Sequence, residues 1–474
     1  MGNTPLGWAA ENGHSEVVKL LLGRDDIDPN KPDEEGQTPL MLAAWNGHEG
    51  VVQILLERDD IDLNQPNEYG QTPLFLAACN GHDGVVKILL SRDDIDSDEP
   101  DNDGRTPLLG ASFNGHEGVM KMLLGRDDIN PDESDDYGRT PLYFAARNGH
   151  EGAVEMLLAQ DDIDSDTPDN YGQTPLHCSA GNGHEGVVEM LLAQDDIDPN
   201  AQNDHGETPL HCAAGGGHEV VVEMLLAQDD IEPNAPDDYG QTPLYCAAGN
   251  GHLGVVEMLL ERDDIDLNAP DHGGQTPLHC AVRNGRERVV ELLLAQDDID
   301  PDTPDKVGQS PFCYAVTYWN DGAVNMLLGR NDVDPNRPDN QGKTPLLLAI
   351  EAEYEGMARI LLGWDNIDPN KADDKSQTPL LLVTGYGDEE LVNMLLERED
   401  INPDISDMDG QTPLYRAALH GHEDVVRILL RWDEVNPDNP NKCRQTALSH
   451  AVRNGDTHVI ALLQPPTAAT HSPY

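Results

Sequence analysis

The sequence has few aromatic residues, few basic residues and no long apolar run. Only 4% of the 474 residues are aromatic, so a hydrophobic core must consist of Leu, Val, Ile and Ala. Lys and Arg number 29 against 89 Asp and Glu, which gives a formal net charge of −60. Nucleic acids and anionic membrane surfaces attract basic proteins, so this charge argues against both as partners. No apolar run approaches the roughly 20 residues of a membrane-spanning helix, and we expect no membrane insertion.

Targeting signals and disulfide bonds are not indicated either. The N-terminal sequence MGNTPLGW has no charged region followed by an apolar stretch, and Leu6 stands where an N-myristoylation motif needs Ser or Thr. The seven cysteines are an odd number in a long chain, which favours reduced thiols in a reducing compartment. We therefore expect an intracellular protein, cytoplasmic or nuclear.

The sequence does contain many copies of one unit of 34 residues. A Thr-Pro pair, with Ser-Pro or Thr-Ala in two copies, recurs fourteen times in constant register. The first residues of these pairs are Thr4, Thr38, Thr72, Thr106, Thr140, Thr174, Thr208, Thr242, Thr276, Ser310, Thr344, Thr378, Thr412 and Thr446. A fixed period of this length predicts stacked units that contact only their neighbours. We predict one array over residues 1–463 and a disordered, Pro-rich tail over residues 464–474.

One copy, Tyr171–Asn200, shows what each unit is expected to form. Thr174 is a good N-cap, the proline after it suits a first helical position, and Gly183 ends this first helix. A second helix is predicted over Glu185–Gln194, whose Val-Val and Leu-Leu pairs form one buried stripe. The following DDIDPN segment and turn form an arm outside the helix layer, with Ile197 as its one apolar anchor.

These residues resemble the ankyrin repeat. The likeness is carried by TPLH at Thr208–His211, the Ala213-Ala214 pair, Gly217-His218 and the VV…LL pattern of the second helix, and it extends over residues 2–463. The resemblance implies an all-α repeat solenoid, an open curved superhelix of helix pairs with hairpin-like arms. The family's usual unit has 33 residues, so we expect a slightly altered arm and an unchanged helix layer.

Motifs for chemistry are incomplete in every copy. His184-Glu185 begins like a zinc-protease motif, but the residue four positions after the histidine is Val188. We expect this histidine to hydrogen-bond the turn between the two helices. An EF-hand loop beginning at Asp94 would need Gly at its sixth position, where Glu99 stands, so only diffuse divalent binding is left open.

Cysteines and histidines form a second column along the array. Cys178, Cys212, Cys246 and Cys280 share one position, flanked by His177, His211 and His279. Packed helices are about 8–10 Å apart, which exceeds the roughly 7 Å between Cα atoms that a disulfide tolerates. Core packing explains the column best. We expect no catalytic, cofactor-binding or metal-binding residues and no enzymatic activity.

Positions that vary between copies are free to serve a partner. The residue after the Ala pair varies from copy to copy, and aromatic residues recur at the predicted arm tips. Aromatic and Arg side chains on a rigid scaffold are common interface anchors. We predict a partner-binding patch on the side that the resemblance implies to be concave. The predicted residues are Trp45, Tyr69, Phe113, Tyr137, Arg147 and Tyr171 in copies two to six, with Tyr239 at the same tip position.

Two alternatives stay open for these residues. The rings could instead cover neighbouring arms, and the irregular copies ten to twelve offer a second region with Lys306, Tyr318, Trp319 and Tyr386. The second region is equally consistent with decay of the repeat.

The expected function is that of a monomeric, non-enzymatic scaffold or adaptor that binds a protein or peptide. The repeated Asp pairs favour a basic partner, or alternatively a solvating surface that prevents aggregation. A second hypothesis is that the array senses a ligand within a larger signalling protein of the nucleotide-switch kind.

Overall fold

The structure is a computed structural model that describes residues 4–464. Apart from Gln464, the tail predicted over residues 464–474 lies outside the described residues. Within residues 4–464 the chain forms 28 α-helices and no strand. The helices come in pairs, which confirms the all-α repeat solenoid predicted from the sequence.

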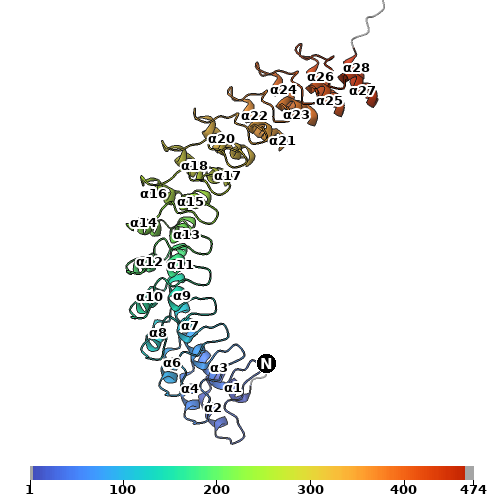
Figure 1. The fold of residues 1–474 in the computed structure, drawn as a ribbon. Helices are drawn as coiled ribbons and strands as arrows, with labels where there is room; N and C mark the ends of the chain where they lie inside the picture. The colour runs from blue at the N-terminus through green and yellow to red at the C-terminus, as the bar shows by residue number, and fades with distance from the viewer. Residues whose placement is uncertain (1–3, 465–474) are drawn as a thin grey trace, which may run out of the picture. The chain divides into compact units, whose positions relative to one another are not determined.

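The first helix of each copy carries an odd number in Figure 1, and the second carries an even number. The first helices are α1 (Pro5–Glu11), α3 (Pro39–Trp45), α5 (Pro73–Cys79), α7 (Pro107–Asn114), α9 (Pro141–Arg147), α11 (Pro175–Asn182), α13 (Pro209–Gly216), α15 (Pro243–Asn250), α17 (Pro277–Arg283), α19 (Pro311–Thr317), α21 (Pro345–Glu351), α23 (Pro379–Tyr386), α25 (Pro413–His420) and α27 (Ala447–Asn454). The second helices are α2 (Ser15–Leu22), α4 (Glu49–Leu56), α6 (Asp83–Leu90), α8 (Glu117–Leu123), α10 (Glu151–Leu158), α12 (Glu185–Leu192), α14 (Glu219–Leu226), α16 (Leu253–Leu260), α18 (Glu287–Leu294), α20 (Asp321–Leu328), α22 (Glu355–Leu362), α24 (Glu389–Leu396), α26 (Glu423–Leu429) and α28 (Thr457–Leu463).

Local rules set the helix boundaries, as α11 and α12 show. The Thr174 side chain accepts a hydrogen bond from the backbone N–H of His177, and Gly183 ends α11 in the left-handed region at φ 74°. Both features were predicted. The second helix ends at Leu192, two residues earlier than predicted, because Ala193 already serves as its C-cap.

The core is a thin layer between successive helix pairs. In unit 1, α11 packs against α9 and α13, and α12 packs against α10 and α14. Val187, Val188 and Leu191 are fully buried between these helices, as the predicted stripe requires. The residue that follows Leu191 is half-buried, so three of the four stripe positions carry most of the burial.

Backbone hydrogen bonds join successive arms. The N–H of Asn170 donates to the carbonyl of Tyr137 in the preceding arm at 2.8 Å. Ile197 is half-buried, whereas Pro199 is buried. The expectation of one apolar anchor was therefore incomplete, because the proline of DDIDPN packs more deeply than the isoleucine.

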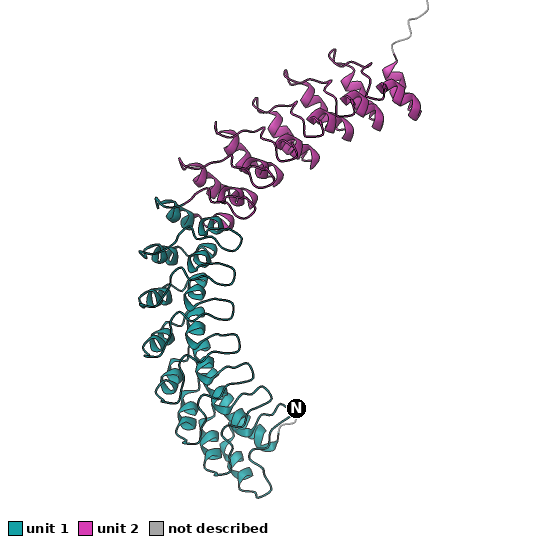
Figure 2. Cartoon of the chain, in the orientation of Figure 1, with its two compact units in different colours: residues 1–247, 254–265 teal, residues 248–253, 266–474 magenta. Residues whose placement is uncertain are grey.

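The chain divides into two compact units. Unit 1 comprises residues 1–247 and 254–265, and unit 2 comprises residues 248–253 and 266–474 (Figure 2). In unit 1, the first helices and the arm tips lie on the inner side of its bend, and the second helices lie on the outer side (Figure 2). The single array of residues 1–463 stays a prediction.

The irregular copies lie in unit 2 and place bulky residues in backbone conformations that favour glycine. Trp319 and Glu353 adopt φ values of 60° and 58° at the position that Gly183 occupies in its own copy. Such residues are strained by about 1–3 kcal/mol each. Ser376 and Arg444 do the same at a second glycine position, in the arms.

Candidate functional site

Unit 1 carries three adjoining pockets that share lining residues. Their volumes are about 570, 380 and 490 Å³. Trp45 and Gln71 line both the first and the second pocket, and Arg139 lines both the second and the third. The three pockets therefore form one groove, which extends from Glu11 to Cys212. This row of pockets is called the groove below.

All six residues of the predicted patch line this groove. Trp45 lines the first and second pockets, Tyr69 the first, Phe113 the second, and Tyr137, Arg147 and Tyr171 the third. Each of these side chains is exposed; Trp45 retains 49% of its accessible surface and Tyr171 retains 58%. The structure thus brings together residues that lie up to 126 positions apart (from 45 to 171).

Two elements of each copy hold these side chains. Trp45, Phe113 and Arg147 lie at the end of α3, α7 and α9 respectively, at the same position of three first helices. The tyrosines lie at arm tips, where the backbone N–H of Tyr137 donates to Asp135 and that of Tyr171 donates to Asp169. Short turns closed by these carboxylates fix the direction of the tips.

The histidine before each second helix fixes the neighbouring groove residue from behind. His82 Nε2 bonds the carbonyl of Trp45 at 2.8 Å, and His184 Nε2 bonds the carbonyl of Arg147 at 3.0 Å. The prediction that this ring bonds its own interhelical turn was wrong about the acceptor. The acceptor belongs to the preceding copy, 37 residues earlier, because stacking places that carbonyl over the ring.

Two arginines that sequence reasoning missed support the groove. Arg139 donates to Asp135 at 2.6 Å, and its guanidinium lies 4.8 Å from the ring centre of Tyr137 and 4.7 Å from that of Phe144. Arg105 binds Asp101 in the same way. The available signal was the residue between Gly and Thr-Pro, which is Gln in most copies and Arg in these two.

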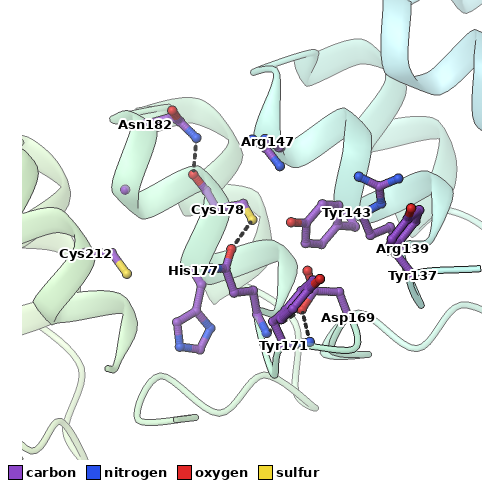
Figure 3. A pocket seen from close by; sticks show the side chains of 12 residues that line it. Tyr137, Arg139, Tyr143, Arg147, Asp169, Tyr171, His177, Cys178, Asn182 and Cys212 are labelled. Atoms are coloured by element: carbon purple, nitrogen blue, oxygen red, sulfur yellow. Dashed lines mark hydrogen bonds between the residues drawn. The ribbon is translucent and has the colours of Figure 1, made fainter. Parts of the chain in front are cut away.

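The third pocket contains several ionisable side chains (Figure 3). Burial raises the pKa of the Cys178 thiol to about 11 and raises the pKa of the Tyr143 hydroxyl. Burial also lowers the pKa of His177, whose Nε2 bonds the carbonyl of Glu207 at 2.9 Å. These three groups are therefore neutral near pH 7, and the thiol is not an activated nucleophile.

The cysteine column lies partly in the core, since Cys178 and Cys280 are buried and Cys212 and Cys246 are half-buried. The cysteines are free thiols, and burial raises the pKa of Cys79 and Cys212 to about 12. Among residues 4–464, no three His, Cys, Asp or Glu side chains lie where they could hold a metal ion. The groove therefore offers rings, hydrogen-bonding groups and a few charges, which suit binding.

The remaining predicted residues lie outside the groove. Tyr239 is exposed at an arm tip of unit 1 and lines none of the three pockets. In unit 2, Tyr318 stacks on Tyr314 with ring centres 5.7 Å apart, and Trp319 meets Tyr354 edge to face at 4.2 Å. Both rings therefore pack on aromatic side chains of unit 2 outside the arms.

Lys306 and Tyr386 do not form a cluster with those rings. Lys306 is exposed, and its backbone N–H and carbonyl bond the neighbouring arms. Tyr386 lines a separate pocket of about 350 Å³ with Glu353 and Asp388. The second candidate region is thus three separate features in unit 2.

The repeated Asp pairs are partly neutralised. In seven copies the Asp at the second position forms an ion pair with the Arg two residues before it, and the first position holds Asp in five of these copies, Asn331 in one and Glu399 in one. The pairs are Arg24–Asp26, Arg58–Asp60, Arg92–Asp94, Arg126–Asp128, Arg262–Asp264, Arg330–Asp332 and Arg398–Asp400. In the five copies with an Asp pair, the first Asp forms no ion pair within residues 4–464 and carries the remaining negative charge of this edge.

Comparison with known families agrees with the paired helices and the repeat period. The family model described as ankyrin repeats (3 copies) matches residues 1–67, 59–135, 127–203, 195–271, 237–305, 264–339, 298–373 and 365–438. The chain therefore belongs to the ankyrin-repeat family. The matches end at residue 438, and the pair α27 and α28 is a further copy beyond them. No curated protein matches the chain.

Membership of this family carries a general function. Ankyrin repeats generally mediate protein–protein interaction and are typically non-enzymatic. None of the helices in residues 4–464 has the length and apolar character required to cross a bilayer.

Proposed function

We propose that this protein is a non-enzymatic scaffold or adaptor that binds a protein or peptide segment in the groove of unit 1. The proposal depends on one observation: residues that vary between copies also line the pockets of the groove. The residues that vary most between copies, such as Trp45, Phe113 and Arg147, are also residues that line the adjoining pockets. The buried Val residues of the second helices, which keep the fold, lie outside these pockets.

Preorganisation is the proposed mechanism of binding. The carbonyls of Trp45 and Arg147 are bonded to the next copy, and Arg139 is held by Asp135 beneath the rings. The backbone of the groove is therefore held in place before a partner binds, and less free energy is lost to ordering. The exposed rings supply apolar contact area, and Arg147, which forms no ion pair among residues 4–464, supplies a free cation.

We further propose a monomeric protein of the cytoplasm or nucleus whose partner is basic at the contact. The free thiols support a reducing compartment, and the net charge of −60 supports a basic partner. Complementary charge of this size raises association rates at low salt.

Affinity capture with the wild-type chain and with the variant Trp45→Ala, Phe113→Ala, Arg147→Ala tests the groove. The variant is expected to retain groove-dependent partners at least about tenfold less, because truncated interface anchors typically cost 2 kcal/mol or more. Tyr239→Ala is the matched control, since this exposed ring lines none of the three pockets. Equal recovery of the same proteins by wild type and the triple variant would show that the groove is not the binding surface.

A further inference from the structure

One acidic or amide side chain closes the turn of each arm. In the sixth copy it is Asp169, whose Oδ1 accepts the backbone N–H groups of Tyr171 and Gln173, both at 2.9 Å. Asp135 closes the preceding arm with the same two bonds. The second carboxylate oxygen, Oδ2, takes no part in the turn and is available to another donor.

In four other copies the chain itself supplies that donor, and in three of them the donor is a guanidinium. Asp101 and Asp135 bind the Arg four residues later, Asp407 binds the Arg nine residues later, and Asp305 binds a tyrosine hydroxyl. The contacts to Oδ2 are Arg105 at 2.6 Å, Arg139 at 2.6 Å, Arg416 at 2.8 Å and Tyr314 at 2.9 Å. The carboxylate at this arm position thus accepts a guanidinium from the arginine four residues later in two copies and from the arginine nine residues later in another.

Asp169 lines the groove and has no such donor. The positions that supply a donor elsewhere hold Gln173 and Cys178, and these two bond each other instead, from Sγ to Oε1 at 3.6 Å (Figure 3). No group in residues 4–464 donates to Oδ2 of Asp169. The residue is only 7% exposed, yet it lines the third pocket, whose volume is about 490 Å³. A nearly buried carboxylate with one unused oxygen therefore faces an open pocket.

We propose that the third pocket receives an arginine side chain of the bound partner, whose guanidinium binds Asp169 as that of Arg139 binds Asp135. The proposal rests on the groove being the binding surface, and it names the chemistry that the groove recognises.

The aromatic lining of the pocket fits this ligand. Tyr137, Tyr143 and Tyr171 line the pocket around Asp169 (Figure 3). The chain's own Arg139 lies over two rings at under 5 Å in the adjacent part of the groove, which shows the contact that a partner's guanidinium can reproduce. A guanidinium is planar and donates in a fork, so it suits a single carboxylate between rings better than an ammonium group does.

The other free charge of the pocket opposes any cation. Arg147 also lines it, and Figure 3 shows this side chain on the far side of Cys178 and Tyr143 from Asp169. The hydrogen bonds from the partner's guanidinium to Asp169 must outweigh this repulsion. An arginine can make two such bonds, so it is favoured over a simple cation. Arg147 itself is left to bind a carbonyl or carboxylate of the same partner.

Two substitutions test the proposal without disturbing the turn. Asp169→Asn removes the charge, and asparagine already closes the equivalent turn at Asn67 through the same two backbone bonds. Gln173→Arg reproduces the pair of Arg139 and Asp135, so the chain's own guanidinium fills the pocket. Asp237→Asn is the matched control, because it removes one charge at the same arm position outside the three pockets.

The first experiment uses acetyl-arginine amide as the probe. Titration into isotope-labelled full-length protein is expected to shift the NMR signals of the Tyr171 and Gln173 N–H groups saturably. Acetyl-lysine amide is expected to bind more weakly. Asp169→Asn and Gln173→Arg should each lower the affinity for acetyl-arginine amide at least about tenfold, because hydrogen bonds to charged groups are the strong ones. Asp237→Asn should bind as wild type does. No saturable shift in wild type, or unchanged binding by both variants, overturns the proposal.

A second experiment separates this inference from the proposed function. Random peptides displayed on phage are selected on the wild-type chain, and the selected peptides are retested on Asp169→Asn and on Trp45→Ala, Phe113→Ala. The inference expects an arginine in the peptides whose replacement by lysine weakens binding, and loss of binding with Asp169→Asn. Peptides that depend on the two rings but on neither Asp169 nor an arginine overturn the arginine pocket alone. Peptides that ignore the rings, together with a saturable shift by acetyl-arginine amide, overturn the groove function alone.

Discussion

One side-chain position determines how well successive arms are bonded to each other. At Asn64, Nδ2 donates to the carbonyl of Asp94 at 2.8 Å and Oδ1 accepts the N–H of Asp96 at 2.9 Å. Both partners lie in the next arm. Asn200 makes the same pair of bonds with its own next arm. The amide is suited to this place because it donates and accepts at once.

Aspartate occupies the same position in several copies. An ionised aspartate can accept the hydrogen bond from the next arm but cannot donate the other one. Asp166 accepts the N–H of Asp198 through Oδ2, while its Oδ1 is buried without a hydrogen-bond partner in the described chain. The unpaired Oδ1 of Asp132 is likewise buried. Burial, reinforced by neighbouring carboxylates such as Asp164, raises the pKa of Asp132 and of Asp166 to about 6. Only the protonated acid can donate as the asparagine amide does.

Replacing these two residues by asparagine is expected to stabilise the protein at pH 7. Asp132→Asn and Asp166→Asn should each raise the free energy of unfolding by about 1–3 kcal/mol, because each restores a bond and removes a buried, unpaired oxygen. Urea unfolding followed by circular dichroism measures the change. Asn200→Asp is the reverse control and should lower the midpoint by a similar amount.

The pH dependence follows from the raised pKa values. The folded state holds these two protons up to about pH 6, whereas an unfolded Asp loses its proton near pH 3.9. The folded state binds more protons between these values, so this contribution is complete below about pH 4 and is lost as the pH rises through 6. The double asparagine variant should lack that part of the pH profile. A variant with the wild-type profile and an unchanged midpoint at pH 7 would refute this account.

At the scale of the elements, a histidine joins each helix pair of copies two to seven to the preceding pair. His184 bonds the carbonyl at the end of α9, and its ring packs against Gly149, where a Cβ atom would lie 2.5 Å from Nδ1. The glycine is therefore required for close approach as well as for its φ of 72°. In unit 2 an arginine replaces the histidine: Arg286 donates to the carbonyl of Gly249 at 3.1 Å.

His184→Ala is expected to loosen the junction between the fifth and sixth copies. The carbonyl of Arg147 loses its partner, which should cost about 1–2 kcal/mol of local stability. Relative to wild type, hydrogen exchange measured by mass spectrometry should therefore become faster in α9 and α11 and stay unchanged in α3 and α5. His184→Arg should restore protection, since Arg286 makes the equivalent bond. If exchange in α9 and α11 of His184→Ala is as slow as in wild type, the ring does not couple the copies.

At the scale of the whole molecule, the net charge of −60 acts on every repeat. Two unit charges about 10 Å apart repel by about 0.4 kcal/mol in water before screening, so each neighbouring pair matters little and the sum over the copies matters more. The ion pairs of seven copies remove part of this repulsion, and the first Asp of the pair, present in five of these copies, retains part of it.

Salt is therefore expected to stabilise the protein. The thermal midpoint should rise between about 0.01 M and about 0.5 M sodium chloride, because the screening length falls from roughly 30 Å to under 10 Å. Sodium chloride is preferred to sulfate, which strengthens apolar burial in any protein. An equal or lower midpoint at high salt would contradict self-repulsion and would assign the Asp edge a solvating role only.

The sequence by itself determined the features that depend on neighbouring residues. The period of 34, the caps at Thr174 and Gly183 and the buried stripe of the second helix follow from local hydrogen bonds and helical periodicity. Variation between copies predicted partner-facing positions such as Trp45 and Phe113, because a repeat exposes what it does not need for stacking. Both residues line the groove, and their use by a partner stays a prediction. A periodic sequence repeats the same local rules, so these local predictions held in copy after copy.

Only the tertiary structure decided which polar groups meet, whether they lie 37 residues apart, as His184 and Arg147 do, or four apart, as Arg139 and Asp135 do. The bond of His184 to the carbonyl of Arg147 depends on how one copy lies against the next. The pairing of Arg139 with the buried Asp135 and the unused oxygen of Asp169 depend on the conformation of one arm. Gln173 and Arg139 occupy equivalent positions, and neither pattern nor composition shows that one leaves a pocket open while the other fills it. Stacking geometry sets these contacts, since each requires atoms from two copies or two sides of an arm to converge.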